Sequence, residues 1–419
     1  MDDFLEKCDE AKKFALVMDN PLIVHHYDAD GVSAGALVCS AFEGKKYRRK
    51  CIKKLDDHAI EELKQEKEII FVDLGGGNKR VNELQDVLII DHHQTEGIEK
   101  FQINPLLFGL DGGKELCSAS TAYCVFRKHA DLAVVGAAGD MQMPLSGMNK
   151  WVAEQGVENG EIVIEQDLRF YGRYCRNLIQ FLAYSDDPYL PGISYREDKA
   201  EELLKDLGLN YENRIYADLN DEEKKTLISA LARILIGTNR KTDLVGESYI
   251  FPKRPKNETY EANEFSTILN ACGRHSKPDI GIRVCLGDES AYQEARELLR
   301  LHRKMLRDGI NYASKNIQNL GNFYFLDGRE IIDEGIIGIV IGMTLRGKKP
   351  IIGVSLGEEG SIKISGRCPK TSEKNMGALM KAATEELGGV GGGHTMAAGA
   401  AIPIDKLNEF LLFCGNYLK

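Results

Sequence analysis

Three short apolar runs in the first ninety residues end directly in acidic or histidine side chains. The runs cover residues 21–24, 68–72 and 87–90. Their length and unbroken apolar character are typical of strands buried on both faces of a parallel sheet, and the stretches between them suit packed helices. The carboxyl ends of parallel strands meet at one edge of an open sheet, where such folds place their sites. The sequence therefore predicts an α/β fold with a mostly parallel sheet flanked by helices and a site at that edge.

The polar residues at these strand ends form a set that suits divalent metals. In chain order they are His26, Asp28, Asp30, Asp73, Asp91, His92 and His93. Carboxylate oxygens mixed with imidazole nitrogens favour manganese, magnesium or cobalt over thiolate-preferring metals. Two such cations about 3.5 to 4 Å apart can hold a phosphate, lower the pKa of a bridging water and stabilise the leaving oxygen. The pattern predicts a two-metal phosphoesterase centre.

Spacing suggests a role for several of these acids. Asp28 and Asp30 are two residues apart on a segment that leaves a strand, so each can reach one metal, and Asp73 from the next strand can bridge both. Another apolar run, 131–140, is a strand or a buried helix that ends in Asp140, which is the fourth acid of the predicted site.

The adjacent His92 and His93 point in different directions, so one can bind metal while the other faces the substrate phosphate. Asp91 is placed to orient an imidazole as a hydrogen-bond acceptor. Taken singly, each acid could instead cap a helix, and each histidine could be a buried residue with its hydrogen bonds formed inside the protein. A calcium loop is excluded because its spacing needs Glu at position 37, which is Leu37.

Composition narrows the class of protein. The 419 residues exceed what one hydrophobic core usually supports, so about two or three domains are expected. The net charge of −10 argues against the broad basic surface of a duplex binder. The ten cysteines include no Cys-x-x-Cys pair, so a zinc site has little support. No apolar run approaches the roughly 20 residues of a membrane span, and the acidic start is unlike a signal peptide, so we expect a cytoplasmic protein with no membrane contact.

Two local basic segments could still bind a single strand. Residues 45–54 are rich in lysine and arginine, and residues 169–176 alternate cations with aromatic rings. Phosphate pairing combined with base stacking suits unpaired nucleic acid. The alternatives are a solvated connection for the first segment and a helix with core-facing aromatic rings for the second.

The chain is expected to comprise four segments. Residues 1–150 form the core that carries the metal residues, 151–285 a helical insertion and the completion of that domain, and 286–318 a connecting helix. Strand-like runs at 323–325, 336–340 and 350–355 begin a smaller second α/β domain, 319–419. Near its end, Gly391-Gly392-Gly393-His394 lacks the lysine of a phosphate loop, but its amides could form a nest for an anion.

These motifs resemble those of the DHH phosphoesterase superfamily, and Gly391 to His394 resembles its companion DHHA1 domain. Within the superfamily, the Asn270-Ala271-Cys272-Gly273-Arg274 and Ser365-Gly366-Arg367 segments resemble those of RecJ-type single-strand exonucleases. The His26 start of the first motif and the helical insertion are most similar to archaeal RecJ-like nucleases, which are relatives of the replisome protein Cdc45.

The resemblance implies a ligand set and a substrate-binding set. One manganese would be held by His26, Asp28 and Asp73, the other by Asp30, Asp73, His92 and Asp140, with His93 near the scissile phosphate. The residues implied to hold the substrate are Asn270, Arg274, Ser365, Arg367, Gly392, Gly393 and His394. Cdc45-type relatives are regarded as having lost metal ligands, whereas this chain retains each one, so catalytic competence is expected.

The resulting expectation is a metal-dependent exonuclease that releases mononucleotides from the end of single-stranded DNA or RNA. Two alternatives remain open. One is a phosphodiesterase or phosphatase for substrates of two to five nucleotides, phosphorylated adenosine nucleotides or cyclic dinucleotides. The other is a replisome scaffold that binds the GINS complex. The sequence leaves the polarity of digestion and the choice between DNA and RNA undecided.

Overall fold

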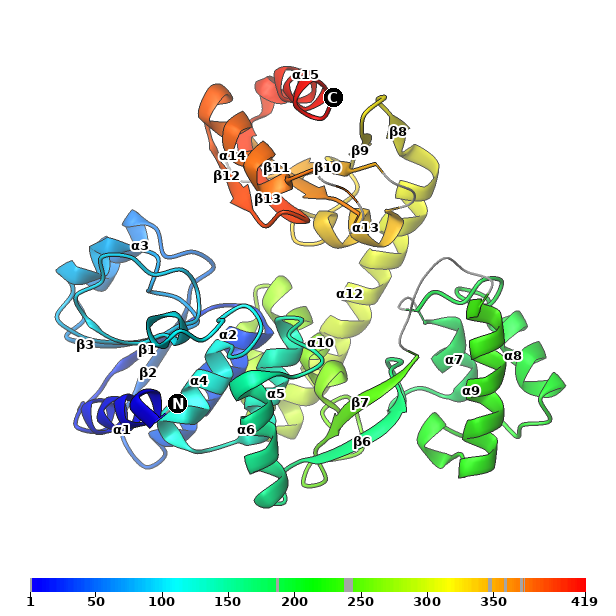
Figure 1. The fold of residues 1–419 in the computed structure, drawn as a ribbon, viewed down its shortest axis with the longest axis horizontal. Helices are drawn as coiled ribbons and strands as arrows, with labels where there is room; N and C mark the ends of the chain where they lie inside the picture. The colour runs from blue at the N-terminus through cyan, green and yellow to red at the C-terminus, as the bar shows by residue number, and fades with distance from the viewer. Residues whose placement is uncertain are drawn as a thin grey trace. The chain divides into compact units, whose positions relative to one another are not determined.

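The computed structural model describes residues 2–419 except 186–187, 237–243, 346–348, 358–359, 370–371 and 373. It divides into two compact units, Met1–Leu299 and Arg300–Lys419, each with its own sheet and hydrophobic core (Figure 1). The predicted class, a mostly parallel sheet with helices followed by a separate C-terminal α/β unit, is confirmed.

The first unit is built around a five-stranded parallel sheet with strand order β2-β1-β3-β4-β5. The strands are β1 (Leu22–His25), β2 (Arg48–Cys51), β3 (Glu68–Val72), β4 (Asp86–Ile90) and β5 (Phe101–Ile103). In chain order, β2 lies on one side of β1, whereas β3 and the later strands lie on its other side. The strand order therefore reverses next to β1. Such a reversal opens a crevice at the carboxyl edge of a parallel sheet. Here the crevice lies between the ends of β1 and β3.

Helices cover both faces of this sheet. One face shares a core with α1 (Asp2–Leu16), α2 (Ala29–Ala41), α4 (Ser118–Phe126), α5 (Ala130–Gly139), α6 (Gly147–Glu158), α10 (Ala262–Arg274) and α11 (Pro278–Cys285). The other face is covered by α3 (Asp57–Leu63) and the 3-10 helix η1 (Lys79–Glu83). A second 3-10 helix, η2 (Pro105–Phe108), follows β5. Small residues make α2 and α5 apolar nearly all round, which is why both helices are buried between neighbours rather than on the surface.

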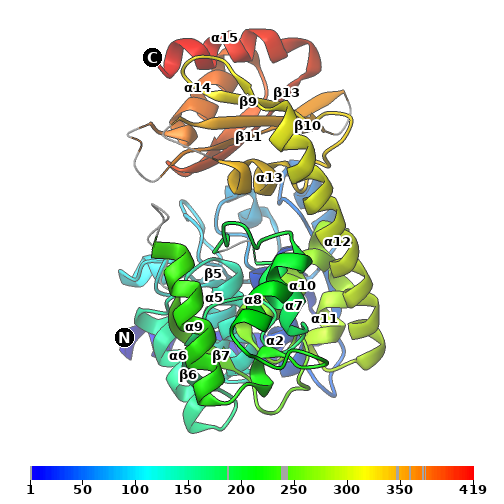
Figure 2. The same cartoon turned by 90° about the vertical axis from the view of Figure 1, so that its right-hand side faces the viewer.

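A helical group with its own core is inserted between two antiparallel strands of the first unit, β6 (Val163–Leu168) and β7 (Val245–Ile250). It contains α7 (Leu178–Ala183), α8 (Glu197–Asp206), η3 (Tyr216–Asp218) and α9 (Asp221–Ile236), which lie together in Figures 1 and 2.

The basic segment 169–176 serves this internal packing. The Arg173 side chain is only 2% exposed and lies 3.5 Å from the Asp167 carboxylate. The Arg176 guanidinium stacks on the Tyr171 ring and donates to the Tyr184 carbonyl. The segment folds as turns rather than as the helix that was the alternative, and Arg173 and Arg176 are used inside the protein, whereas Arg169 is exposed.

The second unit has a six-stranded mixed sheet in the order β12-β13-β11-β10-β9-β8. Its elements are β8 (Gln318–Asn319), β9 (Tyr324–Asp327), α13 (Ile337–Thr344), β10 (Ile351–Leu356), β11 (Ser361–Arg367), α14 (Met376–Leu387), β12 (Val390–Gly393), β13 (Ala397–Pro403), η4 (Ile404–Lys406) and α15 (Leu407–Tyr417). Figure 2 shows α13 on one face of this sheet and α14 with α15 on the other. The expected strand at 336–340 is wrong: this run lies in and just before α13, because packing against the sheet outweighs the strand preference of its isoleucines.

Helix α12 (Glu289–Asn316) is 28 residues long and runs from the first unit into the second. Among the described residues, no helix combines the length and the apolar character needed to cross a membrane.

A close contact between α10 and the loop after β1 predicts the effect of one substitution. A Cβ atom on Gly273 would lie 1.8 Å from the Tyr27 carbonyl oxygen, so Gly273→Ala must displace the backbone that carries Asp28. We expect a loss of about 1 to 3 kcal/mol in the free energy of unfolding, measured from the thermal unfolding midpoint. The control is Gly415→Ala in α15, whose Cβ would meet no atom within 4 Å. A Gly273→Ala protein as stable as the parent would contradict this packing.

Candidate metal centre

The predicted metal residues meet at the crevice between β1 and β3. His26 follows β1, Asp73 follows β3, and Asp91 with its two histidines follows β4. Asp73 has a φ angle of +62°, in the left-handed region that side chains other than glycine rarely adopt. Backbone strain of this kind is usually found where a functional side chain must be aimed in one direction.

On one side of Asp73, a histidine and two carboxylates converge. His26 Nδ1 lies 2.9 Å from Asp28 Oδ2 and 3.3 Å from Asp73 Oδ2. The other oxygen of Asp28 accepts a hydrogen bond from Gly31 N at 3.0 Å, so Asp28 caps helix α2 and still presents an oxygen to His26. One ligand atom from each of the three residues lies within 4.8 Å of the others.

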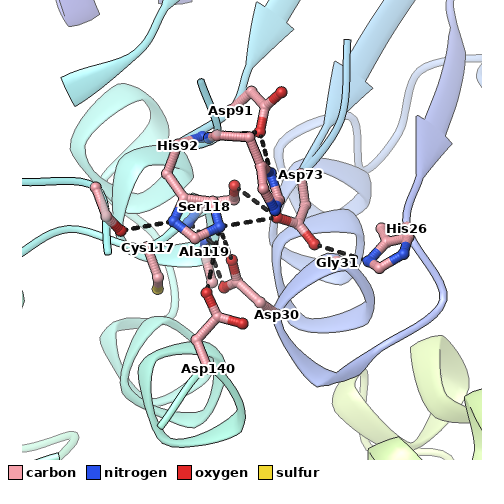
Figure 3. Close-up of polar contacts among 12 residues, drawn as sticks. His26, Asp30, Gly31, Asp73, Asp91, His92, Cys117, Ser118, Ala119 and Asp140 are labelled. Carbon is pink, nitrogen blue, oxygen red and sulfur yellow. Dashed lines mark hydrogen bonds and ion pairs between the residues drawn. The ribbon is translucent and has the colours of Figure 1, made fainter. Parts of the chain in front are cut away.

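On the other side of Asp73, a second group converges on His92 (Figure 3). His92 Nε2 lies 3.2 Å from Asp140 Oδ2, 3.4 Å from Asp73 Oδ1 and 3.9 Å from Asp30 Oδ2. Asp140 is the C-cap of helix α5, and Asp30 lies in the first turn of helix α2. Asp73 therefore directs one carboxylate oxygen to each group.

Buried acceptors orient the two histidines. His92 Nδ1 lies 2.7 Å from the Gly112 carbonyl and donates to it, which leaves Nε2 facing the acids. Asp91 Oδ1 lies 2.8 Å from His93 Nδ1, while Asp91 Oδ2 accepts from Gly76 N at 2.9 Å. Asp91 is thus engaged in holding His93, whose ring is 56% exposed.

The electrostatics of the centre fit a divalent cation on each side of Asp73. Burial and the charge of Asp73 raise the pKa of Asp30 to about 7, and burial and Asp30 raise that of Asp140 to about 9. Burial opposes protonation of the histidines, but Asp28 and Asp73 raise the pKa of His26 to about 12, and Asp73, Asp30 and Asp140 raise that of His92 to about 11. Without cations, these groups must share protons to limit repulsion among the carboxylates.

The buried His26 Nδ1 has no well-directed hydrogen bond among the described residues, although two carboxylate oxygens lie beside it. A nitrogen and two carboxylate oxygens thus converge without an aligned hydrogen bond between them, as the ligands of a shared ion do. The donor set therefore suits manganese or magnesium.

Helix α4 also serves the centre, and sequence reasoning missed it. The amides of Ser118 and Ala119 donate to the two oxygens of Asp30, at 2.8 and 2.9 Å, and the Ser118 hydroxyl donates to Asp73 Oδ1 at 2.9 Å. The run of small polar residues at 118–121 before an apolar stretch signals a helix start. Nothing in the sequence indicates that this helix start faces Asp30.

A pocket of about 270 Å³ lies on the His26 side of the centre and contains two lysines that the sequence had placed only at the end of a basic segment. Lys53 and Lys54 follow β2, whose last residue, Cys51, pairs with His25 of β1. Asn78 fixes their loop by donating to the Leu55 carbonyl at 3.0 Å. Both lysines line the pocket and are exposed, and neither forms a hydrogen bond or an ion pair with any residue that the structure describes.

The predicted substrate-binding residues divide between the two units. Asn270 and Arg274 lie on α10 of the first unit. Asn270 Oδ1 accepts from Ala29 N at 3.0 Å, so it anchors the loop after β1. Burial lowers the pKa of Arg274, although Tyr27 and Asp28 lie close enough to oppose the shift. Arg274 directly follows Gly273, which packs against the Tyr27 carbonyl in the loop after β1.

The remaining predicted residues lie on the second unit. Ser365 on β11 and Gly392 on β12 both pair with Gly399 of β13, so they form one row across three strands. Arg367 ends β11, with its Nη1 donating to the Gly366 carbonyl. Gly393 ends β12, and the exposed His394 follows it.

Family models match three parts of the chain. They describe the N-terminal domain of the DHH family at residues 20–140, a DHH-CID domain at 170–246 and a DHHA1 domain at 318–419. An uncharacterized protein of Methanocaldococcus jannaschii is 30% identical over 440 residues, which cover 97% of each chain.

Solved structures with a similar fold include two kinds of protein. RecJ of Thermus thermophilus in complex with Mn²⁺ has a TM-score of 0.63 at 16% identity, over 99% of this chain and 54% of RecJ. The chain thus spans about half of that protein. CDC45 of Entamoeba histolytica has a TM-score of 0.67 at 13% identity, over 99% of this chain and 98% of CDC45. At these identities, the likeness shows the fold alone.

The pKa values predict that metal binding releases protons. At pH 7.5, His26, His92 and Asp140 are largely protonated without metal, and a bound cation must displace those protons. We expect Mn²⁺ binding to release roughly three protons and to tighten as the pH rises from about 6 to 9. Calorimetric titration in buffers of different ionisation enthalpy measures this release.

The matched variants are His92→Gln, which should release fewer protons, and His58→Gln, which changes an exposed histidine outside the centre and should behave like the parent. A heat of binding that is the same in every buffer would contradict this prediction.

Proposed function

Since the chain belongs to the DHH family, with the phosphoesterase fold and a DHHA1 domain, we propose that it is a metal-dependent exonuclease acting on single-stranded nucleic acid and releasing nucleoside monophosphates. The observation that carries the proposal is that Asp73 directs one oxygen to each of two complete groups of ligands. A phosphodiester held across both groups would be positioned for in-line attack.

The residues that would hold the cations follow from the geometry. His26, Asp28 and Asp73 would hold one. Asp30, His92 and Asp140 would hold the other, together with Asp73, whose Oδ1 lies 3.4 Å from His92 Nε2. Bound at these positions, manganese or magnesium would supply an attacking water with a lowered pKa and charge stabilisation at the phosphate.

His93 would act on the phosphate from the protein side. Its Nδ1 is occupied by Asp91, so Nε2 is the nitrogen left to face a substrate. The hydrogen bond that His93 donates to Asp91 raises the pKa of His93, which favours the imidazolium form with a proton on Nε2 as well. That proton would be donated to a phosphate oxygen or to the leaving oxygen.

Positively charged side chains on the His26 side would bind the neighbouring phosphates of the strand. Lys53 and Lys54 line the pocket there, and Arg274 lies beside Asp28. A net charge of −10 leaves the chain with little general attraction for nucleic acid, so these local charges gain importance. We propose that the second unit holds the strand through Ser365, Arg367, Gly392, Gly393 and His394.

A replisome scaffold that binds GINS is a second candidate, favoured by the fold likeness over nearly the whole of CDC45. It requires no metal chemistry, whereas this chain assembles a full set of acids and imidazoles. Co-purification of GINS with a folded Asp73→Asn protein would support the scaffold as an additional function.

Digestion of labelled single strands tests the proposed function. Single-stranded DNA and RNA 20-mers, labelled at either end, are incubated with the protein and Mn²⁺. Mononucleotides released from one end establish the exonuclease, its polarity and its sugar preference. Intact 20-mers together with cleaved dinucleotides would instead establish a phosphodiesterase for very short substrates.

Replacing the shared carboxylate should abolish this activity. Asp73→Asn removes a negative charge that faces both groups, and we expect kcat to fall at least about a thousandfold because both cations lose an anionic ligand. The circular dichroism spectrum should be unchanged. Activity within tenfold of the parent would refute the role of Asp73.

Removing the pocket lysines should weaken binding more than catalysis. For the Lys53→Ala, Lys54→Ala double variant, we expect KM on a single strand to rise about tenfold and kcat to change less. The slope of log K for binding against log salt concentration should become shallower by about two, because two phosphate contacts are lost. Lys46→Ala is the control, since this exposed lysine of the same basic segment does not line the pocket. Equal effects from both variants would indicate diffuse attraction instead.

A further inference from the structure

The hydroxyl of Ser118 is buried beside the shared carboxylate and is not needed by its own helix. Ser118 is fully buried at the first position of α4, and its Oγ lies 2.9 Å from Asp73 Oδ1. The capping of α4 is supplied by the preceding residue, since Cys117 Sγ accepts from Ser120 N at 3.4 Å. A serine at a helix start usually caps the helix with its hydroxyl. Here that hydroxyl is directed at Asp73 instead.

The contact acts on only one of the two oxygens of Asp73. Oδ2 faces His26, whereas Oδ1 faces His92 and accepts the hydrogen bond from the Ser118 hydroxyl (Figure 3). The left-handed backbone of Asp73 fixes the direction of its Cα–Cβ bond, but the carboxylate plane can still rotate about the Cβ–Cγ bond. A donor on Oδ1 stops that rotation, so that each oxygen stays aligned with its own group.

The main chain of α4 also binds the carboxylate of Asp30. Ser118 N and Ala119 N donate to the two oxygens of Asp30, and a Cβ atom on Gly136 would come within 2.3 Å of one of them. Asp30 is therefore confined by backbone atoms and by close packing. Asp73 depends on a side-chain hydroxyl, which a substitution can remove without moving the backbone.

We propose that Ser118 is a positioning residue that holds the Asp73 carboxylate so that the His92 side of the centre binds its cation. The inference rests on the proposed two-cation centre. Loss of the hydroxyl frees Oδ1 and leaves Oδ2 in place beside His26. The cation held by Asp30, His92 and Asp140 is then weakened, and the cation held by His26 and Asp28 is affected less.

The test is calorimetric titration of metal-free protein with Mn²⁺. For Ser118→Ala, we expect one binding step to weaken about 10- to 100-fold, the usual effect of removing a group that orients a ligand, and the other to stay within about threefold. The weakened step should be the one that His92→Gln abolishes.

Ser120→Ala is the matched control. Ser120 is equally buried two residues further along α4, and its hydroxyl lies 3.5 Å from the Ala133 carbonyl, away from Asp73. This variant should bind Mn²⁺ like the parent. Unchanged binding in Ser118→Ala, or an equal loss in Ser120→Ala, would overturn the positioning role.

A crystal structure of metal-free Ser118→Ala provides a readout that does not depend on metal. We expect the Asp73 carboxylate to be rotated or to occupy two orientations, and a single unchanged orientation would overturn the inference. If the parent binds fewer than two Mn²⁺, the proposed function fails, and the orientation of Asp73 in these crystals still decides the role of Ser118.

Discussion

Burial of several carboxylates at one edge of a parallel sheet is the constraint on which the rest of the first unit depends. Asp30, Asp73 and Asp91 are each no more than 2% exposed. Burying an ionised carboxylate without partners is prohibitively costly, so each of them must be met by donors or by a cation. Helix α4 directs its first amides at Asp30, Gly76 N meets Asp91, and imidazoles flank Asp73 on both sides. The amino ends of helices carry partial positive charge, so both α2 and α4 begin at these acids.

The same constraint explains the small residues around the centre. Gly136 lets α5 pass within contact distance of Asp30, and Gly273 lets α10 lie against the Tyr27 carbonyl. Helix α5 can then place Asp140 at its end, and α10 can place Asn270 under the loop that carries Asp28. Helices that are distant in the sequence thus reach one site because each has a glycine at the point of closest contact.

Fold alone cannot distinguish a nuclease from a scaffold, since RecJ and CDC45 share the architecture of this chain. The function must therefore be inferred from the side chains at the sheet edge. Here the site has a carboxylate shared between two groups, an imidazole oriented by Asp91, and two lysines without counterions in an adjoining pocket.

The sequence by itself determined the sheet edge and the ligand types, because unbroken apolar runs that end in Asp and His leave few other ways to fold. The positions after these runs predicted Asp28, Asp73 and Asp140 as ligands and left open which of His92 and His93 binds metal, and they also predicted the α/β class. The run at 336–340 was misassigned, since tertiary packing outweighed its local preference, and residues 169–176 resembled a nucleic-acid surface until Arg173 and Arg176 proved to be internal. Only the tertiary structure decided that Ser118, Lys53 and Lys54 lie at the centre. Their placement depends on strand order and helix packing. Such contacts between distant segments produce no local pattern in the sequence from which they could be predicted.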